Sequence, residues 1–210
     1  MTIFEAEPIV AIVRYRTPTA LDEVFDAIRL GGIRLVEVTA DTPGALEAVR
    51  AAAESGVAVG AGTIASVEAA RAFAEAGAAF LVSPGTKADV VRAAVELGVP
   101  AVPGALSPTE VAVAVDAGAD AVKLFPAGLG GPDYLRALRG PFSRVAFVPT
   151  GGIRPEDVGS WLDAGAACVG LGASLVGSAP PSNDQELSAL VRRVRDAAGH
   201  TRAAQQRTTA

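Results

Sequence analysis

The sequence predicts an α/β fold, a single (β/α)₈ TIM barrel, and three observations lead to this prediction. Short apolar runs rich in β-forming residues alternate with alanine-rich stretches of helical character. A glycine follows most of these helical stretches, as is typical of helix C-termini. The chain has 210 residues, which is room for one domain with one core, and its steady period gives eight strand–helix units.

The eight units are assigned in chain order. The predicted strands cover residues 10–14, 35–39, 57–61, 80–83, 101–102, 121–125, 146–149 and 168–170. The predicted helices lie near residues 18–30, 43–54, 67–76, 88–97, 108–117, 132–138, 155–164 and 185–198. Helix ends are expected at the left-handed glycines Gly31, Gly56, Gly77, Gly98, Gly118 and Gly165. Helix starts are expected where an N-cap precedes a proline, at Thr17-Pro18, Thr42-Pro43 and Ser107-Pro108.

Residues 1–198 are therefore assigned to one barrel domain, and residues 199–210 are expected to form a disordered polar tail. The rival architecture is an open, doubly wound sheet. Such a sheet is usually less regular, and no G-x-G-x-x-G motif opens the first helix here.

Composition excludes several classes of protein. No apolar run reaches the length of a membrane span, and the N-terminus carries acidic residues where a signal peptide needs basic ones, so we expect a cytoplasmic protein. The net charge of −5 argues against a nucleic-acid partner.

Reactive side chains are few. The sole histidine, His200, falls in the expected tail, so neither a histidine-based triad nor a histidine-ligated metal is expected. The single cysteine, Cys168, excludes an intramolecular disulfide and most thiolate metal sites, and it is expected to pack in the core. Of the two lysines, Lys87 begins a predicted helix and is expected to be solvated. Lys123 lies inside a predicted strand.

Three charged residues stand where packing alone would prefer aliphatic ones: Arg14, Glu37 and Lys123, each within a predicted strand. Side chains alternate between the two faces of a strand. The valines and leucines that flank Glu37 and Lys123 suit the helix-facing side, which points the two charged side chains into the barrel.

An interior amine suggests a specific reaction. Burial and a neighbouring cation such as Arg14 both favour the neutral, nucleophilic form of an amine, and a neutral amine forms Schiff bases with ketones. A nearby carboxyl such as Glu37 would supply the acid–base group that imine chemistry needs. The alternative is a buried Lys–Glu ion pair without chemistry, although such pairs often gain less than their desolvation costs.

Glycines after the last two strands give a second signal. Gly151 and Gly152 follow the seventh strand, and Gly172 and Ser174 follow the eighth. Loops at these positions commonly hold phosphate in such barrels, although the glycines could instead merely permit tight turns. The hydroxyl and backbone N–H of Thr63 could hold a carboxylate, or its segment could be a plain turn.

Six short motifs together resemble the 2-keto-3-deoxy-6-phosphogluconate (KDPG) aldolase family, which includes 4-hydroxy-2-oxoglutarate (KHG) and phosphogalactonate aldolases. The resemblance runs from about residue 9 to residue 176, and it is specific because all six motifs occur in register. They are Glu37-Val38-Thr39, Gly60-Ala61-Gly62-Thr63, Ser83-Pro84-Gly85, Pro103-Gly104, Lys123-Leu124-Phe125-Pro126-Ala127 and Pro149-Thr150-Gly151-Gly152-Ile153.

The resemblance implies a metal-free class I aldolase, without a cofactor, that releases pyruvate and glyceraldehyde 3-phosphate and forms a homotrimer. It implies that Lys123 is the Schiff-base lysine and Glu37 the general acid–base. The other implied substrate-binding residues are Thr63 and Pro84 at the pyruvate pocket, Phe125 beside the lysine, Thr150 at the site, Gly151, Gly152, Gly172 and Ser174 around the phosphate, and Arg14 near the substrate carboxylate.

One departure concerns the preferred substrate. Asp41 stands where many members of the family carry an arginine associated with substrate binding. Two other interpretations stay open at this point: a different phosphate-binding barrel enzyme, such as an isomerase or synthase, and a non-catalytic barrel that binds sugar phosphates.

Overall fold

The computed structural model describes residues 3–208, with side chains up to Thr201, and it contains two parallel sheets. The larger sheet has six strands in the order β5-β4-β3-β2-β1-β8, and the smaller pairs β6 with β7. The strands are β1 Ile9–Val13, β2 Leu35–Thr39, β3 Val59–Gly62, β4 Leu81–Val82, β5 Ala101–Val102, β6 Gly104–Ala105, β7 Lys123–Leu124 and β8 Val169–Leu171. The predicted α/β class with parallel strands is confirmed.

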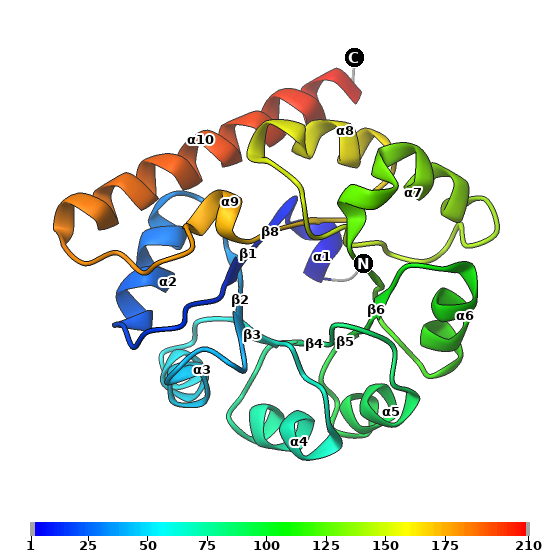
Figure 1. Ribbon diagram of the computed structural model, residues 1–210, viewed down its shortest axis with the longest axis horizontal. Coiled ribbons are helices and arrows are strands. Elements are labelled where there is room, and N and C mark those ends of the chain that lie inside the picture. Colours follow the sequence, from blue (N-terminus) through cyan, green and yellow to red (C-terminus); the bar gives the residue numbers. More distant parts are fainter. Residues whose placement is uncertain (1–2, 209–210) are drawn as a thin grey trace.

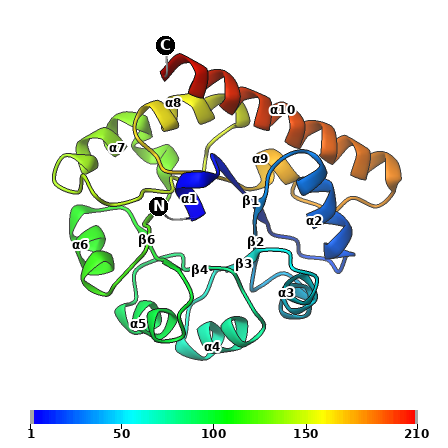
Figure 2. The same ribbon diagram turned by 180° about the vertical axis from the view of Figure 1, so that it is seen from behind.

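The helices other than α1 lie around the outside of the strands, and the strands form a ring (Figures 1 and 2). The helices are α1 Ile3–Ala6, α2 Leu21–Leu30, α3 Ala45–Glu54, α4 Val67–Glu75, α5 Ala88–Glu96, α6 Pro108–Asp116, α7 Gly131–Arg139, α8 Val158–Asp163, α9 Ala173–Val176 and α10 Asp184–Thr208, with 3₁₀ turns η1 Ala127–Leu129 and η2 Pro155–Asp157. Within residues 3–208, none of these helices is long and apolar enough to cross a membrane.

The predicted seventh strand is not a strand in the structure. Residues 146–150 form two isolated parallel bridges, Val122 with Phe147 and Thr150 with Gly170, and further backbone hydrogen bonds to both neighbours, but no assigned strand. Pro149 has no backbone N–H, so it cannot contribute a donor to a regular ladder at this point. The short strand β6 was not predicted, because two residues between a proline and a polar loop give no readable alternation.

Alternation along the strands divides the apolar residues into two clusters. Val36, Val38, Val122 and Leu124 belong to the large cluster that packs against the helices. Leu35 and Ala121, on the opposite face of the same strand segments, belong to a smaller cluster inside the ring. The predicted facing of these two segments is therefore confirmed, and it leaves Glu37 and Lys123 on the inner side.

The inner cluster closes one end of the ring. Phe4 of α1 is 1% exposed and lies edge-on to Phe80, with ring centroids 5.2 Å apart. Cys168 is fully buried in the same cluster, as the sequence predicted. These residues lie toward the amino ends of the strands, and α1 occupies the ring centre in both views (Figures 1 and 2). Solvent can therefore reach the interior from the carboxyl ends.

Two of the three predicted helix caps are wrong. Ser107 forms the expected capping box with Glu110 at the start of α6. By contrast, α2 begins at Leu21 after Ala20, and α3 begins at Ala45 after Gly44, whose φ is +78°. The hydroxyl of Thr42 instead accepts a hydrogen bond from the backbone N–H of Tyr15 at 3.3 Å, so it is not available to cap a helix.

The C-terminal ends of the helices agree better with the prediction from the sequence. Five of the six predicted glycines are left-handed, at positions 56, 77, 98, 118 and 165. Gly31 is not, and Gly32 takes the left-handed conformation instead. A Cβ on Gly31 would lie 2.4 Å from Val194 Cγ1, so this glycine is needed for the close approach of α10.

The last helix is longer than predicted. Helix α10 continues past residue 198 to Thr208, so His200 lies in a helix rather than in a disordered tail, and residues 209–210 lie outside the described residues. Thr201 is 2% exposed and donates a hydrogen bond from its hydroxyl to Ala198 O at 2.8 Å. Alanine, arginine and glutamine after it are good helix formers, which explains the continuation.

Candidate active site

A pocket of about 990 Å³ opens at the carboxyl ends of the strands. In a sheet of this kind, these ends are where ligands bind. The pocket is lined by every candidate residue that the sequence singled out: Arg14, Glu37, Thr63, Pro84, Lys123, Phe125, Thr150, Gly151, Gly152, Gly172 and Ser174. The chain thus brings together residues that are up to 160 positions apart (174 − 14).

Lys123 and Glu37 form the buried centre of the pocket. Lys123 Nζ lies 3.9 Å from Glu37 Oε1, and the two side chains are 12% and 3% exposed. The Lys123 amine also lies 5.5 Å from the centroid of the Phe125 ring. Glu37 Oε1 has no hydrogen-bond partner among the described residues. A buried carboxylate oxygen without a partner is costly, so it is available to a ligand or a reacting group in the pocket.

A glycine on the neighbouring strand makes room for Glu37. Glu37 of β2 pairs in register with Gly60 of β3, and Gly62 follows two residues later on the same face. A Cβ on Gly62 would lie 1.9 Å from Glu37 Oε1, which no structure can accommodate without a shift. Gly62 therefore allows the Glu37 carboxylate to lie against the backbone of β3.

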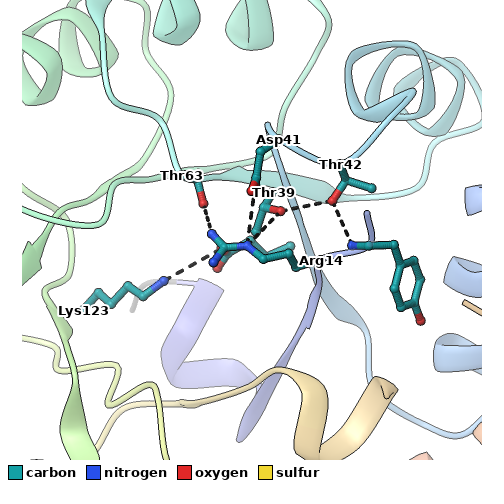
Figure 3. Close-up of polar contacts among 8 residues, drawn as sticks. Arg14, Thr39, Asp41, Thr42, Thr63 and Lys123 are labelled. Carbon is teal, nitrogen blue, oxygen red and sulfur yellow. Dashed lines mark hydrogen bonds and ion pairs between the residues drawn. The ribbon is translucent and has the colours of Figure 1, made fainter. Parts of the chain in front are cut away.

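Arg14 lies directly after β1 at the rim of the pocket, and its polar contacts are drawn in Figure 3. Its Nη2 donates to Thr63 Oγ1 at 2.5 Å, and its Nε donates to Thr39 Oγ1 at 3.3 Å. Asp41 Oδ1 lies 3.5 Å from the same Nε, and the two side chains are 49% and 39% exposed. Burial raises the pKa of Asp41, but a hydrogen bond with Thr39 and the charge of Arg14 outweigh it and hold this pKa below its usual value.

Thr63 has a strained backbone at the site. Its φ is +60°, a left-handed conformation that is uncommon for a residue other than glycine. Such strain tends to gather at functional sites. Because Thr63 Oγ1 accepts from Arg14, its hydroxyl proton is free to donate to another acceptor in the pocket.

The opposite wall of the pocket is rich in glycine. Gly151 and Gly152 both have left-handed φ values, +91° and +75°. Thr150 Oγ1 donates to Val148 O at 3.2 Å, and a Cβ on Gly170 would lie 2.3 Å from this hydroxyl. The Ser174 hydroxyl donates to Ile153 O at 2.8 Å. Exposed backbone N–H groups in glycine-rich segments of this kind can hold an anion.

Sequence reasoning missed two arginines that line the pocket, Arg16 and Arg154. Arg154 forms a hydrogen bond with Asp157, which raises the pKa of Arg154 and lowers that of Asp157. Both arginines lie in loops soon after strand positions, Arg16 two residues beyond Arg14 and Arg154 shortly after Gly152. A search for basic residues in these loops, rather than within strands, would have found them.

Other reactive side chains lie outside the pocket. Lys87 is exposed and donates to Ala65 O at 2.8 Å, as expected for a solvated lysine. Burial raises the pKa of the Cys168 thiol, which makes it a poor nucleophile. Among residues 3–208, no three histidine, cysteine or acidic side chains are grouped so as to hold a metal ion.

Several known proteins similar to this chain in sequence are aldolases. The family described as "Aldolase: KDPG and KHG aldolase" matches residues 1–190. The 2-dehydro-3-deoxy-6-phosphogalactonate aldolase of Escherichia coli strain K12 is 33% identical, over 90% of this chain and 96% of its own length. The 2-dehydro-3-deoxy-phosphogluconate aldolase of Treponema pallidum is 42% identical, over 77% of this chain and 80% of its own.

Solved structures agree with the sequence relatives. A structure described as native KDPGal superimposes with a TM-score of 0.83 at 31% identity, covering 95% of this chain and 96% of that one. The KDPG aldolase of Legionella pneumophila, solved with pyruvate captured as a covalent carbinolamine, gives a TM-score of 0.80 at 30% identity, covering 92% and 95%. These names support the aldolase interpretation over the isomerase, synthase and non-catalytic ones. The chain is an aldolase, and it belongs to the KDPG and KHG aldolase family.

Proposed function

We propose that this chain is a class I aldolase that cleaves 2-keto-3-deoxy sugar-acid phosphates into pyruvate and glyceraldehyde 3-phosphate. The observation that carries the proposal is the pair of nearly buried side chains, Lys123 and Glu37, with 3.9 Å between Nζ and Oε1 at the floor of the pocket. An amine in such a place is a nucleophile for a ketone, and a carboxyl beside it can move protons. The covalent pyruvate adduct described for the Legionella relative supports the same chemistry.

Lys123 begins the reaction by forming a bond from Nζ to C2 of the keto acid. Protonation of the resulting C2 hydroxyl and loss of water give a protonated imine, with Glu37 as the nearest acid–base group to Nζ. Glu37 then removes the proton of the C4 hydroxyl. The C3–C4 bond breaks, its electron pair moves into the imine as an enamine, and the aldehyde leaves. Protonation of C3 and addition of water to the imine release pyruvate and restore the free amine.

Arg14 and Thr63 are proposed to hold the carboxylate of the keto acid. The guanidinium can form paired hydrogen bonds with a carboxylate, and the Thr63 hydroxyl proton is not used by Arg14. Pro84 and Phe125 are proposed to border the pyruvate moiety on its apolar side. This assignment places the substrate carboxylate at the same side of the pocket as Asp41.

The phosphate is proposed to bind at the glycine-rich wall. Gly151, Gly152 and Gly172 line the pocket there, so that their backbone N–H groups could bind an anion, with Thr150 and Ser174 beside them. Arg154 lies on the same wall and adds positive charge. Because two charged ends of the substrate would bind at different sides of the pocket, the keto group between them is directed toward Lys123.

Borohydride trapping tests this function. Incubation with pyruvate and borohydride should add a stable mass to the peptide that contains Lys123, because reduction fixes the imine. Lys87→Met, a matched variant at the only other lysine of the sequence, should leave trapping unchanged, whereas Lys123→Met should abolish both trapping and pyruvate release. Turnover of a phosphorylated keto acid without any adduct on Lys123 would contradict the proposal.

Three further assignments belong with this proposal. We propose that the strands close into an eight-stranded barrel, with residues 146–150 in the seventh position. In support, Val122 N donates to Ala146 O at 2.8 Å, Leu124 N donates to Val148 O at 3.1 Å, and Gly170 N donates to Pro149 O at 2.9 Å. The homotrimer and the cytoplasmic location expected from the sequence stay predictions.

A further inference from the structure

Asp41 and Arg14 form a partly exposed ion pair at the pocket. The Arg14 guanidinium has three oxygen partners: Thr39 and Asp41 both face Nε, and Thr63 faces Nη2 (Figure 3). The guanidinium carries five N–H donors, so donors are left for a ligand. At 49% exposure, the Arg14 side chain opens to the pocket rather than being packed into the core.

We propose that Asp41 is a positioning residue that fixes the Arg14 guanidinium for the carboxylate of a 2-keto acid, an inference that rests on the proposed function. Asp41 and Thr39 hold the Nε edge of Arg14. The terminal nitrogens are thereby turned toward Thr63 and the pocket. A planar fork held along one edge presents its other edge in a single orientation, and this lowers the entropy lost when a carboxylate binds.

The turn that carries Asp41 is itself held in place. Thr42 N donates to Thr39 O at 2.8 Å, and the hydroxyls of Thr39 and Thr42 lie 3.0 Å apart. Thr42 Oγ1 also accepts from Tyr15 N at 3.3 Å, which ties this turn to the residue that follows Arg14. Thr39 and Thr42 are 1% and 3% exposed. Asp41 therefore lies in a turn whose buried hydrogen bonds connect the loops that follow β1 and β2.

The negative charge of Asp41 indicates that this residue acts on the substrate carboxylate indirectly. The balance of burial against the hydrogen bond with Thr39 and the charge of Arg14 keeps the pKa of Asp41 low, so its carboxylate is ionised at neutral pH. An ionised Asp41 would repel the carboxylate of a keto acid if the two were in direct contact. Its favourable contribution to binding therefore passes through Arg14.

A double-mutant cycle on pyruvate trapping tests the proposal. The readout is the pyruvate concentration that gives half-maximal borohydride trapping on Lys123, measured by intact mass for the wild type, Asp41→Asn, Arg14→Ala and the double variant. We expect Asp41→Asn to raise this concentration about twofold to fivefold, within the range for a partly exposed pair. The change at half-saturation should exceed the change in trapping rate at saturating pyruvate. In the Arg14→Ala background, Asp41→Asn should add no further change, because its effect passes through Arg14.

Two outcomes would overturn the inference. An unchanged half-saturating concentration in Asp41→Asn would mean that the pair does not position Arg14. An equal increase with and without Arg14 would mean that Asp41 acts on the ligand directly. Failure of the wild type to be trapped would instead contradict the proposed function, so the two failures can be told apart. Circular dichroism and thermal unfolding of each variant verify that the fold is retained.

Discussion

The pocket contains two ion pairs that differ in almost every physical respect. Lys123 and Glu37 lie within strands, and their side chains are 12% and 3% exposed. Arg14 and Asp41 lie just beyond the ends of strands, and theirs are 49% and 39% exposed. Attraction between charges is screened by water at an exposed site and much less so at a buried one. We therefore expect the buried pair to carry out the chemistry and the exposed pair to adjust substrate recognition. The effects of mutation should be largest at the floor of the pocket and smaller toward and beyond its rim.

The largest effect is expected for Glu37→Gln. The amide keeps the shape of the side chain but cannot accept or release the proton, so kcat should fall by about 10²–10⁴-fold. Pyruvate should still bind, and borohydride should still trap it, at a slower rate. A coupled assay of pyruvate release measures kcat, and intact mass measures trapping. Full activity of Glu37→Gln would contradict the claim that the buried pair, Lys123 and Glu37, carries out the chemistry.

Gly62→Ala should have the next largest effect, because its Cβ would lie 1.9 Å from Glu37 Oε1 and displace the carboxylate. A misplacement of about 1 Å can reduce a rate by about 10²-fold, so we expect kcat/KM to fall by about 10-fold to 10²-fold. Gly85→Ala is the matched control, since a Cβ at this position meets nothing within 4 Å. Equal activity of the two variants would show that Glu37 does not depend on its place against β3.

Gly152→Ala probes the opposite wall. The residue has φ +75°, where a side chain costs about 1–2 kcal/mol, and relief of this strain would move the backbone N–H groups proposed to hold phosphate. We expect KM for a phosphorylated keto acid to rise about tenfold, while the half-saturating pyruvate concentration in trapping changes less. The measurement compares the change in KM with the change in the half-saturating pyruvate concentration. An equal rise in both would place the effect at the keto end instead.

The smallest effect is expected outside the pocket, at the capping box of α6. Glu110 accepts hydrogen bonds from the backbone of Leu106 and Ser107, which lower its pKa. Glu110→Ala should reduce the free energy of unfolding by about 1 kcal/mol, as measured by urea denaturation, with unchanged turnover. Glu96→Ala, at the end of α5, is the control and should change stability by less than about 0.5 kcal/mol.

The loss of stability in Glu110→Ala should depend on pH. Because the pKa of Glu110 is lower in the folded state than its ordinary value of 4.5, the carboxylate contributes stability above that value. This contribution is lost as the pH falls through the folded pKa. The stability difference between the wild type and Glu110→Ala should therefore shrink below pH 4.5. A difference that grew in acid would contradict the assigned shift.

The floor of the pocket could be predicted from the sequence, since Lys123 and Glu37 lie in strands whose alternation fixes the direction of each side chain. The same rule found the division between the inner and outer apolar clusters. Ser107 could be predicted as a cap because its capping box is purely local. Thr42 could not, because its hydroxyl bonds to Tyr15, which is distant in the sequence.

The rim was harder to predict for a related reason. Asp41 drew attention only as a departure from a family pattern, and its contact with Arg14 depends on two loops that come together in space. Arg16 and Arg154 lie in loops without periodicity, so no strand rule indicated their direction. The seventh strand was overestimated because an apolar run predicts extended backbone but not an assigned strand, and Pro149 has no N–H to donate to a neighbouring strand.

Solvent deuterium exchange into pyruvate tests the central claim most directly, because it requires both an imine on Lys123 and a nearby group that moves the C3 proton. In D₂O, the wild type should exchange the methyl protons of pyruvate, followed by loss of their proton NMR signal, without any aldehyde present. Glu37→Gln should retain pyruvate trapping yet exchange at least about 10²-fold more slowly, and Lys123→Met should not exchange. Exchange that persisted in Lys123→Met, or was absent from a wild type that releases pyruvate, would contradict the account.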